Sequence, residues 1–148
     1  MTKRRELLSG MINAELSKQL MILVNNAVGS LAEVTSVVSS SGINLIALCA
    51  YEVEGKVAIM VVTADNNESK KLLEKQGFAV QEQEVILLTI ANKPGALQRV
   101  TDLLAESGIS LSLIYGSVDE KSESSRIIII AEDNMDAMVI IKTLIERR

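Results

Sequence analysis

The stretch Asn92-Lys93-Pro94-Gly95-Ala96-Leu97 follows a short apolar run and leads into a segment whose apolar residues recur at helical spacing. It predicts a strand, a tight turn and a helix start, because Pro94 fixes its own φ and suits the first turn of a helix. Gly95 has no Cβ, so a ligand or another backbone segment can approach it closely. The amides of Ala96 and Leu97 are then expected among the unpaired N–H groups of a helix N-terminus, which favour an anion such as a carboxylate. A strand-to-helix turn without a ligand is the plainer alternative for the stretch taken alone.

The same stretch occurs twice in the chain. A shift of 66 residues (95 minus 29) places Gly29 on Gly95 and keeps strand, turn, helix and following strand in register. The other aligned pairs are Asn26 with Asn92, Leu31 with Leu97, Val34 with Val100, Val37 with Leu103, Val38 with Leu104, Gly42 with Gly108, Ile43 with Ile109 and Leu45 with Leu111. The chain is therefore interpreted as an internal duplication.

The duplication divides the 148 residues into an extension at 1–17 and two units at 18–84 and 85–148. The apolar spacing in residues 4–15 predicts a short amphipathic helix in the extension. Units of roughly 65 residues are near the small end for independent folding, so they are expected to lean on each other or on a second chain. Exposed sheet edges and apolar helix faces favour self-association, most often as a two-fold homodimer.

Both units are predicted to follow the order strand, helix, hairpin, helix. In the first unit the expected elements are a strand at 20–24, a helix from a capping box at Ser30 and Glu33 to about Ser41, a hairpin of 43–53 and 56–63, a helix from the Asp65 cap to about Gln76, and a fourth strand at 78–83. In the second unit they are a strand at 85–90, a helix at 96–107, a strand at 109–118, a polar loop at 119–125, an interior strand at 127–130 and a helix from Asp133. The loop is four residues longer than its counterpart if Arg126 matches Lys56.

This order predicts an α+β fold of two ferredoxin-like βαββαβ units, each an antiparallel sheet with its helices on one face. The second unit has no evident last strand before the chain stops at Arg148. Its sheet is expected either to be short by one strand or to be completed from elsewhere, for example by a partner chain. The architecture hosts several functions, so the fold alone decides little.

Composition excludes several classes of function. A net charge of −4 and an aromatic fraction of 2% argue against nucleic acid as a partner, since RNA recognition needs stacking aromatics. Charged residues make up 23% and interrupt every apolar run well short of the roughly 18 residues that a membrane span needs. The N-terminus has no secretory signal, and a lone Cys49 forms no disulfide within the chain, which fits a cytoplasmic protein.

No enzyme chemistry is evident in the sequence. The chain has no histidine, so the commonest general base and metal ligand is absent. Cys49 lies in an apolar run that suggests a buried thiol, and Glu132 and Asp133 are best explained as helix caps. Phosphate loops, Cys-x-x-Cys pairs and nucleophile elbows are also missing. We therefore expect a non-catalytic protein without a cofactor or metal.

Leu87–Leu111, and its echo Met21–Leu45, resemble the ACT domain, a small regulatory module of amino-acid metabolism. The family pattern is a strand followed by Asn-x-Pro-Gly-x-Leu, a helix, and then Gly-Ile-Asn-Leu or similar. The resemblance extends from residue 20 to about 146 and implies a free-standing tandem ACT protein. It also implies regulation by a bound amino acid at the junction of two ACT units, where the first helix of one unit faces a strand of the other.

The resemblance also implies the ligand-binding residues. An Asn before the Pro-Gly turn and an Asn that opens the second strand contact the ligand in amino-acid-binding members of the family. The first repeat keeps both but has Val28 in place of Pro, and the second keeps the turn but has Ser at the strand position. The candidate ligand-binding residues are Asn26, Gly29, Ser30, Leu31 and Asn44 in the first repeat, and Asn92, Pro94, Gly95, Ala96, Leu97 and Ser110 in the second.

Each candidate also has a purely structural explanation. Asn26 and Asn92 can close their own turns by hydrogen bonds to nearby backbone. Asn44 and Ser110 can simply be strand-edge residues that follow a helix end. Two functions therefore remain: an amino-acid sensor that signals to a partner enzyme or regulator, and a structural or assembly module, or regulatory subunit of a biosynthetic enzyme, with no ligand site of its own.

Overall fold

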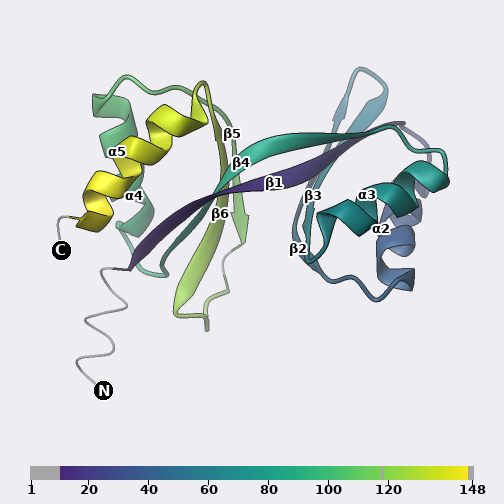
Figure 1. Cartoon of the computed structure of the whole chain (residues 1–148), viewed down its shortest axis with the longest axis horizontal. Helices are drawn as coiled ribbons and strands as arrows, with labels where there is room; N and C mark the ends of the chain where they lie inside the picture. The colour runs from purple at the N-terminus through teal and green to yellow at the C-terminus, as the bar shows by residue number, and fades with distance from the viewer. Residues whose placement is uncertain (1–10, 118, 147–148) are drawn as a thin grey trace. The chain divides into compact units, whose positions relative to one another are not determined.

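The computed structural model describes residues 11–117 and 119–146 (Figure 1). Its elements are β1 (Ile12–Asn25), α2 (Ser30–Ser40), β2 (Leu45–Val53), β3 (Lys56–Thr63), α3 (Asn66–Lys75), β4 (Val80–Ala91), α4 (Ala96–Glu106), β5 (Leu111–Ser117), β6 (Ser124–Ala131) and α5 (Asn134–Glu146). The strands hydrogen-bond in the order β2-β3-β1-β4-β6-β5. The predicted α+β class with two βαββαβ-like units is confirmed.

The chain folds as two compact units that share the strands β1 and β4. One unit, here called unit 2, is residues 18–83 and corresponds to the first of the two predicted units. The other, unit 1, combines residues 1–17 with 84–148 and corresponds to the second predicted unit. The run from 78 to 90, predicted as two strands, is therefore the single strand β4, whose first part belongs to unit 2 and whose second part belongs to unit 1.

Unit 2 has the ferredoxin-like strand order within itself. Its part of β1 pairs with β3 in a register that runs from Leu20↔Val61 to Asn25↔Lys56, and β2 pairs with the other side of β3. The helices α2 and α3 pack on the same face of this sheet (Figure 1). Their buried contacts with the sheet come from Leu20, Ile22, Val34, Val38, Ile59, Val61 and Leu73.

Unit 1 repeats this arrangement with a strand taken from the N-terminal end of the chain. β4 pairs with β6 from Ile86↔Ile129 to Ala91↔Ser124, and β5 pairs with the far side of β6, which makes β6 an interior strand as predicted. On the other side of β4, the Ala91 amide donates to the Met11 carbonyl at 3.1 Å. The missing fourth strand is thus supplied within the chain by the first part of β1.

The expected helix in the extension is wrong over its described part, because residues from Ile12 onward form a strand. Ile12 and Ala14 are buried in the core of unit 1, whereas Asn13 and Glu15 are exposed. The alternation of buried and exposed residues is that of a strand with one covered face. Residues 4–10 of the expected helix lie outside the described residues.

Two of the predicted helix caps are confirmed. The Asp65 carboxylate accepts a hydrogen bond from the Glu68 amide at 3.0 Å, and Asp133 accepts one from the Asp136 amide at 3.0 Å. Each cap satisfies one of the amides that a helix start leaves unpaired. None of the helices in the described part of the chain is long and apolar enough to cross a membrane.

The predicted capping box at Ser30 is wrong. Gly29 is the N-cap of α2, and Ser30 is the first helical residue. The Ser30 hydroxyl donates to the carbonyls of Asn25 and Ala27, at 3.1 and 2.9 Å. The side chain therefore closes the preceding turn, which is a common alternative use of a serine next to a helix start.

Candidate functional site

The turn between β4 and α4 is a β-turn of the type that Pro-Gly favours. The Ala96 amide donates to the Lys93 carbonyl at 3.2 Å, which closes a four-residue turn with Pro94 and Gly95 at its corners. Gly95 has φ 86° and ψ −10°, the values of the third position of a type II turn, where a residue with a Cβ is strained. Apart from the two chain neighbours of Gly95, no atom of the described residues lies within 4 Å of the place where its Cβ would be, so the space there is open.

The unpaired amides at this helix start are those of Leu97 and Gln98. Neither donates to any partner among the described residues, while the Arg99 amide bonds to the Gly95 carbonyl at 3.2 Å and begins the helical ladder. The expectation of a free amide was right for Leu97 and wrong for Ala96, because the type II turn uses the Ala96 amide. The unpaired amide of Gln98 was not predicted from the sequence. A type II turn that uses the Ala96 amide would have indicated it, because the next two amides, those of Leu97 and Gln98, then have no helical partner.

Asn92 holds the longer hairpin loop against this turn. Its side-chain Nδ2 donates to the carbonyls of Asp119 and Ser122 at 2.8 and 2.9 Å, and its backbone amide donates to the Glu123 carbonyl at 3.0 Å. The side chain therefore does make backbone hydrogen bonds, but to residues 119–122 rather than within its own turn. These bonds account for both amide hydrogens and leave Oδ1 as an acceptor.

The corresponding turn of unit 2 has the same backbone arrangement. Gly29 has φ 91° and ψ −2°, and the Ser30 amide donates to the Ala27 carbonyl at 3.1 Å. The amides of Leu31 and Ala32 have no partner among the described residues, as in unit 1. Two type II turns with two unpaired amides each are therefore the structural counterpart of the repeated sequence.

The two turns differ in their side chains. The Asn26 backbone amide bonds to the Gly55 carbonyl at 2.9 Å, but its exposed side chain makes no hydrogen bond with the described residues. Val28, at the place of Pro94, is fully exposed, and Leu31 is 39% exposed. The turn of unit 2 is therefore more exposed than the turn of unit 1, and it is held to its short hairpin by the Asn26 backbone amide and not by the Asn26 side chain.

Asn44 and Ser110 lie at the opposite end of their sheets from these turns. The Ser110 carbonyl accepts from the Glu132 amide at 2.9 Å, just past the end of β6, whereas Asn92 bonds to Glu123, just before β6 begins. Asn44 is likewise bonded to Ala64, at the far end of β3 from Asn26. The two candidate positions within a unit are separated by a full strand, roughly 30 Å at the usual rise per residue. They do not form one site within a unit.

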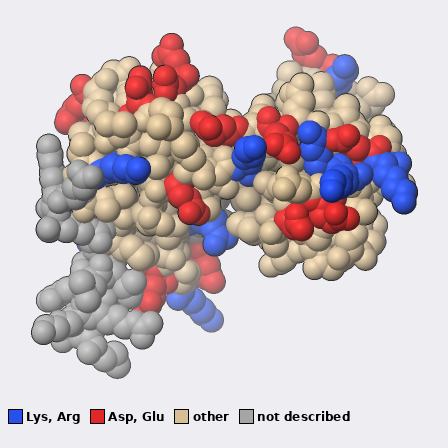
Figure 2. Space-filling view, viewed as in Figure 1, with Lys and Arg blue, Asp and Glu red and all other residues tan. Residues whose placement is uncertain are grey.

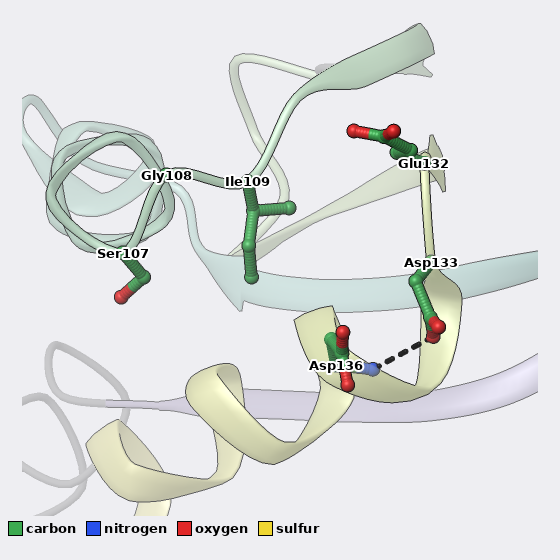
Figure 3. A pocket seen from close by; sticks show the side chains of 6 residues that line it. All are labelled: Ser107, Gly108, Ile109, Glu132, Asp133 and Asp136. Carbon is green, nitrogen blue, oxygen red and sulfur yellow. Dashed lines mark hydrogen bonds between the residues drawn. The ribbon is translucent and has the colours of Figure 1, made fainter.

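A pocket of about 400 Å³ lies at the Ser110 end of unit 1. Figure 3 shows Ser107, Gly108 and Ile109, which follow α4, on one side of the pocket. Glu132 and Asp133, from the connection between β6 and α5, and Asp136, from the first turn of α5, lie on the other side. The Asp133 carboxylate is already engaged by the Asp136 amide. Sequence reasoning identified the acidic residues as caps and did not predict that they line a pocket.

Other chemistry is sparse in the described part of the chain. It contains no group of three or more Cys, Asp or Glu residues that could hold a metal ion, and Cys49 is half-buried rather than buried as expected. Acidic and basic side chains are intermixed over unit 2 on the face that Figure 2 shows. In unit 2, Lys70 pairs with Glu74 at 3.7 Å and with Glu82 at 4.0 Å. Exposed pairs of this kind add little to stability.

Comparisons with known proteins agree with the sequence resemblance. The family described as "AHAS small subunit-like ACT domain" matches residues 86–146. Among solved structures, the protein BT0572 from Bacteroides thetaiotaomicron is 28% identical, with a TM-score of 0.81 over 88% of this chain and 89% of that chain. No curated protein matches the chain.

Two aspartate kinase structures share the fold at lower identity. The ligand-free regulatory subunit from Thermus thermophilus is 17% identical, with a TM-score of 0.60 over 88% of this chain and 95% of that chain. Aspartokinase III of E. coli, solved with lysine and aspartate, is 16% identical, with a TM-score of 0.55 over 92% of this chain and 32% of that chain. These likenesses support the tandem architecture.

Proposed function

We propose that this chain, which is an ACT domain protein, is a non-catalytic regulatory module that binds an amino acid at its helix-start turns and relays the bound state to a partner protein. The observation that carries the proposal is the repeated pair of unpaired amides, Leu97 with Gln98 and Leu31 with Ala32, each behind a type II turn with open space before its glycine. Aspartokinase III, which shares the fold, was solved with two amino acids bound.

The turn of unit 1 offers complementary groups for both ends of an amino acid. A carboxylate fits the amides of Leu97 and Gln98 at the positive end of the α4 dipole. An ammonium fits an acceptor such as Asn92 Oδ1, whose two amide hydrogens are used elsewhere. The open space at Gly95 can take part of a ligand, because apart from the chain neighbours no atom of the described residues lies within 4 Å of its Cβ position.

We further propose that a second copy of the chain completes the site. Ser110 and Asn44 lie a full strand away from the turn of their own unit, so they can contact a ligand there only from another ACT unit. A homodimer would supply such a unit by two-fold symmetry. Ligand binding at a subunit contact would stabilise one packing of the two copies, which is the coupling that regulation of a partner requires.

Removal of a single amide hydrogen tests the binding mode and identifies the functional repeat. Gln98→Pro removes one unpaired amide from α4, and Ala32→Pro removes its counterpart from α2, both in the first helical turn, where proline is tolerated. Calorimetric titration with each of the twenty amino acids should show binding to the wild type. Binding should weaken at least tenfold in the proline variant of the functional repeat.

Gln98→Ala is the matched control, since it removes the side chain and keeps the amide, and it should bind as the wild type does. Unchanged affinity in both proline variants would contradict ligand binding by the helix-start amides. A folded, dimeric wild type that binds none of the twenty would instead support the assembly module. The bonds from Asn92 to the hairpin loop favour that second function, because they give Asn92 a structural role without a ligand.

A further inference from the structure

The side chain of Asn92 has a fixed orientation in unit 1. Its two hydrogen-bond partners, the carbonyls of Asp119 and Ser122, can only accept, so the amide nitrogen must face them. Oδ1 points to the other side of the amide group and has no partner among the described residues. Asn92 thus contacts the hairpin loop through its Nδ2 and offers Oδ1 as an acceptor beside the turn at residues 93–96. This turn, where the ligand is proposed to bind, is called the ligand turn below.

The loop is held by hydrogen bonds from Asn92 and by hydrogen bonds among its own residues. Three hydrogen bonds connect Asn92 to the loop carbonyls, at 2.8, 2.9 and 3.0 Å. Within the loop, the Lys121 amide donates to the Asp119 carboxylate at 3.0 Å and the Ser122 amide to the Asp119 carbonyl at 2.9 Å. In unit 2, where the hairpin is four residues shorter, the backbone bond to Gly55 is the only hydrogen bond that Asn26 makes to its hairpin among the described residues.

We infer that Asn92 is a positioning residue that couples the ligand turn to residues 119–123, so that this exposed loop reports occupancy of the turn. The inference rests on the proposed function. A donor that binds Oδ1 polarises the amide and strengthens its two N–H donors toward Asp119 and Ser122, because chained hydrogen bonds are cooperative. The loop is therefore more ordered when the turn is occupied. By linkage, an ordered loop raises the affinity of the turn for its ligand.

Asn92→Asp separates the two roles of the residue. The carboxylate keeps an acceptor for the ligand ammonium but cannot donate to the loop carbonyls, so it should bind the ligand and fail to order the loop. Asn67→Asp adds the same charge at an exposed position of α3 that belongs to neither turn, and it is the matched control. The probes are the twenty amino acids, added one at a time to the full-length protein.

Amide hydrogen exchange of Lys121 and Ser122 is the readout, alongside the ligand-induced shift of the unfolding midpoint. In the wild type and in Asn67→Asp, a stabilising amino acid should slow exchange of these amides at least threefold. In Asn92→Asp the midpoint should still shift, while exchange in the loop stays unchanged by the ligand.

The outcomes that overturn the inference are distinct from those that overturn the proposed function. A wild type stabilised by an amino acid without slower exchange in the loop removes the coupling and leaves amino-acid binding intact. Slower loop exchange that persists in Asn92→Asp shows that the coupling does not run through Asn92. A wild type that none of the twenty stabilises removes the proposed function, and the coupling falls with it.

Discussion

Glycine has two different uses in this chain, and they can be told apart residue by residue. Gly29 and Gly95 are required by their positive φ at the corner of a type II turn, and nothing crowds them. Gly116 on β5 is required by space, because a Cβ there would lie 2.9 Å from the Arg126 carbonyl oxygen and would overlap the Ile127 side chain. The turn glycines were predictable from the repeated motif. The strand glycine was not, because its constraint comes from the partner strand.

Gly116→Ala should lower the free energy of unfolding by about 1–3 kcal/mol, since a side chain forced into an occupied space displaces its neighbours. Ile127 belongs to the core of unit 1, so the displacement is transmitted inward. Urea unfolding of the variant measures the loss, with the exposed neighbour Ser117→Ala as the control, which should stay within about 0.5 kcal/mol of the wild type. Equal stability of Gly116→Ala and wild type would show that β5 can shift enough to make room for a Cβ at this position.

At the scale of elements, two asparagines fix where the helices meet the shared strands. Asn66 Oδ1 accepts from the Thr63 amide at 2.9 Å, and its Nδ2 donates to the Lys18 carbonyl at 2.8 Å. Asn134 repeats the pattern with the Ala131 amide at 2.8 Å and the Glu84 carbonyl at 3.1 Å. Sequence reasoning predicted these helix starts but not the shared strands. Polar residues at 17–19 and 81–84 have the composition of linkers, and their strand state depends on pairing with each other.

The contribution of the first part of β1 to unit 1 gives a prediction for this element. Ile12→Ala should lower the free energy of unfolding by about 2–5 kcal/mol, because it opens a cavity in the core. Leu16, on the same strand but 40% exposed, should cost about 1 kcal/mol or less when changed to alanine. Chemical denaturation of both variants makes the comparison. Similar small losses at both positions would mean that residues 12–17 do not complete the sheet of unit 1.

At the scale of the whole molecule, the duplication and the α+β class could be predicted because the apolar pattern and the turn motif repeat in register. The sharing of β1 and β4 between the two units could not be predicted. The apolar spacing around Met11 and Ile12 fits a helix and also fits the alternating pattern of a strand. Only the pairing of Met11 with Ala91 decides between the two structures. The candidate site was predictable at its turns. The separation of Asn92 from Ser110 became evident only from the strand register.

Thermal unfolding of the full-length protein in the presence of each of the twenty amino acids is the most direct test of amino-acid binding. A ligand at 100 times its dissociation constant adds about 2.7 kcal/mol of stability, which for a chain of this size raises the midpoint by several degrees. We expect such a rise with at least one amino acid, and we expect Gln98→Pro or Ala32→Pro to abolish it. A midpoint that none of the twenty moves would contradict amino-acid binding and leave the chain as an assembly module.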